Sequence, residues 1–259
     1  MKSRNIQPID LVSIILPTYN EAENIVELIR QVDKVVKNPK QIIVVDDNSP
    51  DGTSKIVMDY IKKSNKKNIQ VLTRIRNHGL TNSLKDGLKL VKGDAVVWLD
   101  CDFSMPPRVI NKLLKKVENG YDIAVGSRFV KGGSFKIDSA GVQKDSPVAI
   151  ILSRLMNFSI QLLLGGNFRD YTSGFIAARF QVFNVITLRG DYGEYFIDLI
   201  YKARVHKFKI SEVGYICLPR RKGVSKTGQN LPQFLRRGVK YILLTFQLLA
   251  EKHIFHKIP

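Results

Sequence analysis

The stretch AVVWLDCDFSMPP, residues 95–107, decides the predicted fold. It begins with five apolar residues in a row, a pattern typical of a strand buried on both faces of a parallel sheet. It ends with Pro106-Pro107, a pair typical of the first turn of a helix. Asp100 and Asp102 lie between the two. The stretch therefore predicts a strand, a short acidic loop and a helix, which together form one βα unit.

Similar units lie on both sides of this stretch. Four further apolar runs predict short strands: VSIILP (12–17), IIVVD (42–46), VLTRI (71–75) and IAVGSR (123–128). The intervening segments predict helices that start near four residues: Glu21, Thr53, Leu80 and Pro106. Repeated βα units make right-handed crossovers, so we expect an α/β fold with an open, mostly parallel sheet flanked by helices. Such sheets bind ligands beyond the carboxyl ends of their strands.

Two polar segments carry helix-start signals. Asn20 is followed three residues later by Glu23, which is the spacing of a capping box. Asp51 comes directly before Gly52-Thr53 and predicts a turn with a helix cap. Both segments follow predicted strands, so the turns lie where ligands are expected.

The second half of the chain is less regular. It predicts, in order, a helix over Pro147–Leu164, a helix near Gly193–Val205, a strand near Ile210–Cys217 and an amphipathic helix from Leu231. No linker or repeat divides the rest of the chain. We expect a catalytic domain in residues 1–230 and a basic amphipathic C-terminal helix in residues 231–259.

Composition narrows the class of protein. With 259 residues and 44% hydrophobic residues, the chain is neither disordered nor a coiled coil. Its net charge is +18, and from Lys202 onward 13 Lys and Arg face only Glu212 and Glu251, a net of +11. This basic end predicts an anionic partner, either nucleic acid or an acidic membrane surface. Nucleic acid is disfavoured because the sequence has no zinc spacing, RNP motif or helix-turn-helix signature.

The cysteines and apolar segments bear on location. Two cysteines, Cys101 and Cys217, make no disulfide framework, which fits a reducing cytosol. The N-terminus has no signal-peptide pattern, and the longest apolar runs, from Val148 and over Tyr241–Ala250, fall short of about 18 uninterrupted apolar residues. Arg154 interrupts the first run. We therefore expect a soluble or peripheral membrane protein.

Acidic residues follow three of the predicted strands. Asp100 and Asp102 are one residue apart, so both can reach a single Mg²⁺ or Mn²⁺ ion that also takes water and phosphate oxygens as ligands. Asp46 and Asp47 end the strand IIVVD, and the segment Pro17–Glu21 ends a third strand. The strand ends are expected to converge on one polar crevice.

Six motifs occur in an order that resembles a known family. They are PTYNE (17–21), VVDDNSPDGT (44–53), LDCDFSMPP (99–107), GSRFVKGG (126–133), DYTSGF (170–175) and RRKGVSKTG (220–228). The ordered set resembles family 2 glycosyltransferases of the GT-A fold, and within them the dolichol-phosphate mannosyltransferase group of polyprenyl-phosphate hexosyltransferases. The resemblance runs from about Val12 to Gly228.

The resemblance implies a role for each matching residue. Nucleoside or nucleotide-sugar contacts are implied for seven residues: Pro17, Tyr19, Glu21, Asp47, Asp100, Cys101 and Asp102. Metal ligands are implied at Asp100, Asp102 and Ser104. Contacts to the donor and acceptor phosphates are implied for Arg128, Ser153, Arg220 and Lys226. Relatives often have an Arg four residues before Ser153, where this chain has Ala149, and Lys144 or Arg154 is available to replace it.

The implied reaction is inverting transfer of mannose from GDP-mannose to dolichyl or another polyprenyl phosphate. A phosphate acceptor needs no general base, because a monoester with a second pKa of about 6 is already mostly dianionic at neutral pH. Three alternatives stay open. The donor could be UDP-glucose or another nucleotide-sugar. The acceptor could be a saccharide hydroxyl, with Asp170, Glu194 or Asp198 as base. The chain could also be a non-catalytic lipid- or protein-binding module of the same fold.

Two segments are candidates for membrane contact. The helix from Leu231 interleaves bulky apolar residues with Arg236, Arg237 and Lys240, a pattern that suits a helix in the plane of an anionic membrane surface. Pro147–Leu164 is the second candidate. The alternative is a helix packed on the sheet or covered by a membrane-anchoring subunit. We expect peripheral attachment at the cytoplasmic side of the membrane. The histidines, His78 among them, are expected to be solvated or in the core, and Cys101 to pack inward.

Overall fold

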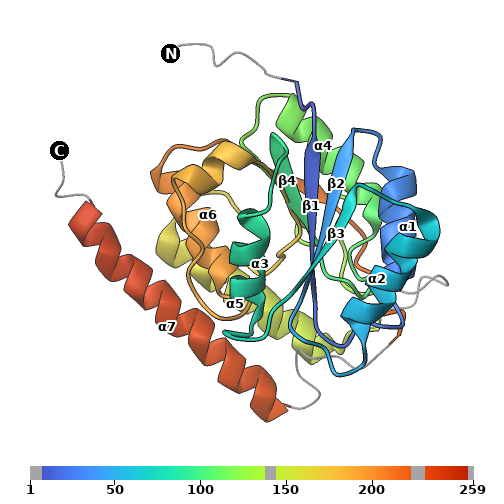
Figure 1. Cartoon of the computed structure of the whole chain (residues 1–259). Coiled ribbons are helices and arrows are strands. Elements are labelled where there is room, and N and C mark those ends of the chain that lie inside the picture. The colour runs from blue at the N-terminus through green and yellow to red at the C-terminus, as the bar shows by residue number, and fades with distance from the viewer. Residues whose placement is uncertain (1–7, 138–143, 223–230, 256–259) are drawn as a thin grey trace.

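The computed structural model describes residues 8–137, 144–222 and 231–255. A seven-stranded sheet with the order β3-β2-β1-β4-β6-β5-β7 forms its centre, and helices cover both faces (Figure 1). One hydrophobic cluster contains Leu28 and Leu113 from helices on the first face, and a second contains Leu84 and Leu199 from helices on the other. The protein thus has three layers with the sheet between two cores.

The strands are short and mostly parallel, as predicted. Their bounds are β1 (Val12–Thr18), β2 (Lys40–Asp46), β3 (Ile69–Thr73), β4 (Ala95–Trp98), β5 (Ile123–Ser127), β6 (Ile176–Arg179) and β7 (Ile210–Gly214). The exception is β6, which runs antiparallel to both of its neighbours, β4 and β5. This strand comes from the DYTSGFIAAR segment and inserts between two strands of the predicted βα series.

The helices follow the predicted order. Their bounds are α1 (Ile25–Val35), α2 (Thr53–Ser64), α3 (Leu80–Leu88), α4 (Ile110–Glu118), α5 (Pro147–Leu164), α6 (Tyr195–Val205) and α7 (Leu231–Phe255). Two 3₁₀ helices lie at η1 (Pro107–Val109) and η2 (Phe180–Asn184). The predicted starts at Thr53, Leu80, Pro147 and Leu231 are confirmed.

The predicted start of the first helix is wrong. The helix begins at Ile25, with Asn24 as its N-cap, and not near Glu21. Asn20 has a left-handed backbone with φ +54, and its N–H donates to the Ser49 hydroxyl over 2.9 Å. Contact with a distant loop therefore replaces the cap that Asn20 and Glu23 predicted. The turn predicted at Asp51 is confirmed, because its carboxylate accepts hydrogen bonds from the N–H groups of Ala22 and Thr53, but the N-cap of the helix is Gly52 and not Asp51.

The parallel register brings the acidic strand ends together. Thr18 at the end of β1 pairs with Asp46 at the end of β2, and Ile15 in β1 pairs with Trp98 at the end of β4. Because parallel strands share one carboxyl edge, the segments after β1, β2 and β4 emerge at the same edge of the sheet. The predicted convergence of three polar strand ends is confirmed.

Helix α5 is more exposed and more suited to a membrane than the sequence predicted. It is the one helix among the described residues that is long and apolar enough to cross a membrane by length and composition, in spite of Arg154. Five of its apolar side chains are between 58% and 72% exposed: Val148, Ile151, Leu155, Phe158 and Leu162. It contacts α7, which lies along the same side of the molecule as α5 and α6 (Figure 1).

Candidate active site

A pocket of about 430 Å³ opens at the carboxyl edge of the sheet. Eight residues that the sequence indicated line it: Pro17, Tyr19, Glu21, Asp47, Asp100, Cys101, Asp102 and Arg220. Five of its lining residues are carboxylic acids, and Arg220 carries the balancing guanidinium. The pocket is thus acidic, which is an unusual surface for an anionic ligand unless a cation binds with it.

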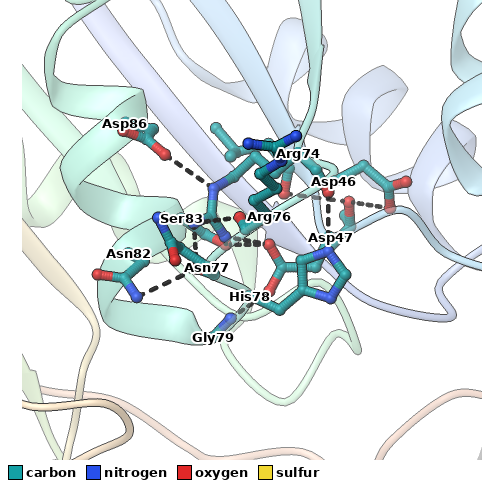
Figure 2. A network of polar contacts seen from close by, with 12 residues as sticks. Asp46, Asp47, Arg74, Arg76, Asn77, His78, Gly79, Asn82, Ser83 and Asp86 are labelled. Atoms are coloured by element: carbon teal, nitrogen blue, oxygen red, sulfur yellow. Dashed lines mark hydrogen bonds and ion pairs between the residues drawn. The ribbon is translucent and has the colours of Figure 1, made fainter.

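Asp47 is held by a buried network around Arg74 (Figure 2). The carboxylate of Asp47 accepts hydrogen bonds from the Arg74 guanidinium, from Ser83 Oγ over 2.9 Å and from the N–H of Gly79 over 2.6 Å. Arg74 also pairs with Asp86 over 2.8 Å. Gly79 has φ +124, a backbone conformation that favours glycine. The network therefore positions the segment between β3 and α3 as one wall of the pocket.

The neighbouring acid, Asp46, is buried outside the pocket. It is 1% exposed and accepts hydrogen bonds from Thr18 Oγ1 over 2.9 Å, from the N–H of Ser49 over 3.0 Å and from Ser54 Oγ over 2.8 Å. It does not line the pocket. Asp46 instead holds the turn after β2 in the shape that presents Asp47.

Asp102 lies between a backbone donor and a cation. Its Oδ1 accepts from the N–H of Ser104 over 2.9 Å, and its Oδ2 pairs with Arg220 Nη2 over 3.0 Å. Arg220 Nη1 pairs with Glu21 Oε1 over 3.1 Å. One guanidinium therefore bridges two carboxylates that are far apart in the sequence.

The residues at this edge fit a divalent cation whose coordination is completed by the substrate. Within the described residues no group of three or more His, Cys, Asp or Glu side chains could hold a metal ion. Asp100 and Asp102 offer two hard oxygen ligands beside the pocket, and Mg²⁺ commonly binds one or two carboxylates together with water and phosphate oxygens. Ser104 is 7% exposed and does not line the pocket, so its role as a ligand stays a prediction.

A second polar cluster surrounds Arg128. Its guanidinium makes two hydrogen bonds to the fully buried Asp170, of 3.0 and 2.7 Å, and a third to Thr172 Oγ1 over 2.7 Å. Burial alone would lower the pKa of Arg128, but the charge and hydrogen bonds of Asp170 raise that pKa above its ordinary value. Asn157 of α5 also donates to Thr172, over 3.1 Å, and to the carbonyl of Ser153, over 2.9 Å. The main-chain carbonyl of Ser153 is thus linked to Arg128 through Asn157 and Thr172.

Neither Arg128 nor Ser153 lines the acidic pocket. The segment from Tyr215 to Arg221 connects the two places, because the N–H of Tyr215 donates to the carbonyl of Ser127 over 3.2 Å and the N–H of Arg221 donates to the carbonyl of Asp102 over 3.1 Å. Burial raises the pKa of the Cys217 thiol to about 11, against a lowering effect of Arg128 and a further raising effect of Asp102. The N–H of Leu218, the next residue, donates to the carbonyl of Ser104 over 3.0 Å. Arg154 lies 5.8 Å from the Phe135 ring centre and Arg128 lies 5.7 Å from it. Lys226 lies outside the described residues.

The three carboxylates considered as bases for a saccharide acceptor have structural roles. None of them lines the pocket. Asp170 is bound to Arg128, and Glu194 accepts from the N–H groups of Asp191 and Tyr192. Asp198 pairs with Arg189 over 3.0 Å and Lys202 over 2.8 Å, and burial raises its pKa despite the Lys202 charge. Their positions give no support to a hydroxyl acceptor.

The sequence missed several residues that shape the pocket. His78, Gly79, Leu80 and Ser83 follow β3, while Asp191 and Tyr192 precede α6. The run RIRNHG after a strand was an available signal, because it is a polar segment at the same edge as PTYNE. His78 is exposed, as one of its two predicted environments, and it also lines the pocket. Nothing in the local sequence marks Asp191 or Tyr192. Cys101 is 3% exposed and packs inward as predicted.

Comparisons with known proteins agree with this geometry. The model of the family described as glycosyl transferase family 2 matches residues 13–187. The dolichol-phosphate mannosyltransferase of Pyrococcus furiosus is 34% identical over 227 residues, which cover 87% of this chain and 62% of that protein. The polyprenol monophosphomannose synthase of Mycolicibacterium smegmatis is 33% identical over 233 residues, 87% of this chain and 84% of that protein. The chain thus spans less than two thirds of the Pyrococcus protein.

Solved structures share the fold. A glucosyl-3-phosphoglycerate synthase from Mycobacterium tuberculosis, in complex with Mn²⁺, UDP and glucosyl-3-phosphoglycerate, superposes with a TM-score of 0.66. It is 17% identical and covers 93% of this chain and 80% of that one. The mannosyl-3-phosphoglycerate synthase of Rubrobacter xylanophilus has a TM-score of 0.67 at 17% identity, and the match covers 96% and 77% of the two chains. At this identity the likeness concerns the fold alone.

Proposed function

The chain belongs to glycosyl transferase family 2, and on that premise we propose that it transfers mannose from GDP-mannose to a dolichyl or other polyprenyl phosphate. The observation that carries the proposal is the acidic pocket at the carboxyl edge of the sheet. Five carboxylic acids and one arginine line it; Arg74 and Lys240 pair with two of the acids, Asp47 and Asp191, and the charge left around Asp100 and Asp102 favours a diphosphate that enters with a divalent cation. The relatives with 34% and 33% identity are named as mannose transferases or synthases that act with a polyprenol phosphate.

Mg²⁺ or Mn²⁺ is the proposed cofactor, held by Asp100 and Asp102. When bound, such a cation neutralises the charge that develops on the leaving diphosphate. Pro17, Tyr19, Glu21 and Asp47 are proposed to surround the nucleoside, with Cys101 as packing beneath it. Arg74 and Gly79 contribute indirectly, because they hold Asp47 and the loop after β3 in place.

The acceptor phosphate is proposed to bind at the cluster around Arg128, here called the cationic side, near Ser153. Arg220 and Lys226 are proposed to contact the donor and acceptor phosphates. The attacking phosphate oxygen forms a bond to the anomeric carbon while the bond from that carbon to the diphosphate breaks. One such displacement inverts the anomeric centre. No proton has to be removed, because the lipid monoester is mostly dianionic at neutral pH. Positioning and positive charge therefore supply the catalysis.

Arg154 is the proposed substitute for the arginine that relatives often have at the position of Ala149. Arg154 lies one helical turn or so further along α5, and its guanidinium is 5.8 Å from the ring of Phe135. The Arg128 guanidinium is 5.7 Å from the same ring. Two cations beside one aromatic side chain support Arg154, rather than Lys144, as the second group for the acceptor phosphate.

The exposed helices are proposed to lie on an anionic membrane surface at the cytoplasmic side. Phe158 and Leu162 of α5 are 62% and 72% exposed, and Ile242 and Phe246 of α7 are 53% and 58% exposed. Bulky apolar side chains next to a basic C-terminal segment are typical of interfacial binding. A membrane-anchoring subunit over the same helices is the alternative outcome of the test.

The test measures transfer of radiolabelled sugar from a panel of nucleotide-sugars to a short polyprenyl phosphate, with Mn²⁺, Mg²⁺ or EDTA. We expect metal-dependent label in the lipid phase from GDP-mannose. Label from UDP-glucose instead would replace the donor and keep the reaction. Donor binding without transfer to lipid, in the presence of vesicles, would contradict the proposed acceptor.

A further inference from the structure

The C-terminal helix α7 contacts the loop that forms one wall of the acidic pocket. Asp191 and Tyr192 line the pocket, and they lie in the segment between β6 and α6. Lys240 of α7 forms an ion pair with Asp191. The hydrogen bond to Lys240 is the main cause of a lowered pKa at Asp191. A charged group from the last helix thus reaches a residue of the pocket wall.

A second contact lies beside this ion pair. A Cβ atom added at Gly193 would clash with the Tyr241 hydroxyl, so α7 packs directly on the turn Asp191–Gly193. The same turn is braced from the other side, because Thr81 Oγ1 of α3 donates to the carbonyl of Tyr192 over 3.3 Å. The Glu194 carboxylate accepts hydrogen bonds from two N–H groups of the turn, that of Asp191 over 3.1 Å and that of Tyr192 over 3.3 Å. The turn is therefore fixed between α3, α6 and α7.

The two faces of α7 differ. Leu244 and Leu248 are 5% and 0% exposed and belong to the core that α6 also lines. Val239, Leu243 and Phe246 are between 51% and 58% exposed. The helix therefore contacts the pocket wall with one face and presents an apolar surface with the other.

We propose that Lys240 and Tyr241 of α7 are positioning residues for the donor pocket, which act through the turn Asp191–Gly193. The Asp191 carboxylate pairs with Lys240, and the donor contacts the main chain of the turn and the Tyr192 side chain. The inference rests on the proposed function, because the ligand of the pocket is taken to be a nucleotide-sugar. Its consequence is that donor binding depends on how α7 is seated, and α7 carries part of the surface proposed to meet the membrane.

The chain offers a matched control on the same helix. Glu251 of α7 pairs with Arg189 over 2.6 Å, and neither residue lines the pocket. Glu251→Gln and Lys240→Ala therefore each remove one ion pair between α7 and the segment before α6. Only the second removes it from the pocket wall.

The experiment uses the full chain and has two readouts. Amide hydrogen exchange over residues 190–196 of the free protein reports the order of the turn, and titration with GDP-mannose and Mn²⁺ reports donor affinity. For a partly exposed ion pair we expect Lys240→Ala to raise the donor dissociation constant about three-fold and to speed exchange, while Glu251→Gln changes neither. Exchanging the charges, Asp191→Lys with Lys240→Asp, should restore slow amide exchange in the turn. Equal effects of the two single variants, or an exchanged pair in which amide exchange stays fast, would overturn the proposal.

A second pair of variants tests the packing contact without any charge. Gly193→Ala forces the turn or Tyr241 to move, and we expect donor affinity to fall. Tyr241→Phe removes the clashing oxygen, so the double variant should recover most of the loss. If it does not, the contact has no positioning role. Should the wild-type protein bind no nucleotide-sugar at all, the proposed function fails, and the exchange measurements alone still decide whether α7 orders the turn.

Discussion

The acidic pocket and the cationic cluster beside it balance their charges in opposite ways. On the acidic side, Arg220 is shared between Glu21 and Asp102, which leaves one negative charge in excess in that trio. On the cationic side, Arg128 is matched one to one by Asp170, which is fully buried. The acidic side therefore keeps a net charge that a bound cation can neutralise, whereas the Arg128–Asp170 pair is neutral and offers an acceptor phosphate hydrogen bonds without a net positive charge.

The largest effect is expected from the acidic side. Asp102→Ala should lower transfer by about a thousand-fold or more, because it removes a proposed metal ligand and frees Arg220 from half of its bridge. EDTA should have the same effect on the wild type. The measurement is label transferred to polyprenyl phosphate. Glu23→Ala is the control, since Glu23 is exposed and outside the pocket; full activity of the Asp102 variant would remove the acidic side from the chemistry.

Substitutions on the cationic side should lower the stability of the protein. Asp170→Asn leaves the Arg128 side chain, which is 18% exposed, without its counter-charge, which we expect to cost up to about 3 kcal/mol of the free energy of unfolding. Urea denaturation measures the loss. The double variant Arg128→Met with Asp170→Leu should regain part of the stability and remain inactive, because no charge is left to pair or to bind phosphate. A stable and active double variant would make the cluster dispensable, and the contrast between the two sides would disappear.

The exposed face of α5 should affect membrane binding and hardly affect stability. Phe158→Ser and Leu162→Ser change side chains that are 62% and 72% exposed, so the free energy of unfolding should stay within about 0.5 kcal/mol. Partitioning onto anionic vesicles should weaken about ten-fold for each bulky side chain that enters the membrane. Vesicle sedimentation measures it. Met58→Ser is the control, because Met58 is 44% exposed and lies on α2, on another part of the surface.

The smallest effect concerns Cys217. Since burial raises the pKa of its thiol to about 11, only about one molecule in a thousand carries the thiolate at pH 8. Labelling of Cys217 by a thiol reagent should therefore be slow in the folded protein and should accelerate as the pH approaches 11. Unfolded protein should react at the ordinary rate. Fast labelling at pH 8 would mean that the region between the two sides is open to solvent.

The first half of the chain was predictable because its signals are local. Each strand is a short apolar run, and the acids follow it directly, so Asp47, Asp100 and Asp102 could be placed at one edge before the sheet was known. The error at Asn20 arose because Ser49, from another loop, competes for that backbone. Arg74 was missed for a similar reason, since its partner Asp47 lies 27 residues earlier.

The second half was less predictable because its site residues depend on contacts between distant elements. The insertion of β6 between β4 and β5 places Asp170 beside Arg128, 42 residues away. Asp191 and Tyr192 enter the pocket because α3 and α7 hold their turn. No local pattern of residues encodes such contacts. The proposed boundary at residue 230 stays a prediction, and α7 packs closely against α5 and α6.

The bridge from Glu21 through Arg220 to Asp102 also sets an order for assembly during synthesis. A ribosome makes β1, β2 and β4 early, and these segments can pair as they emerge. Arg220, which pairs with Glu21, is made 199 positions later. Until then the link between Glu21 and Asp102 is missing, so we expect the binding edge of the sheet to close late in synthesis.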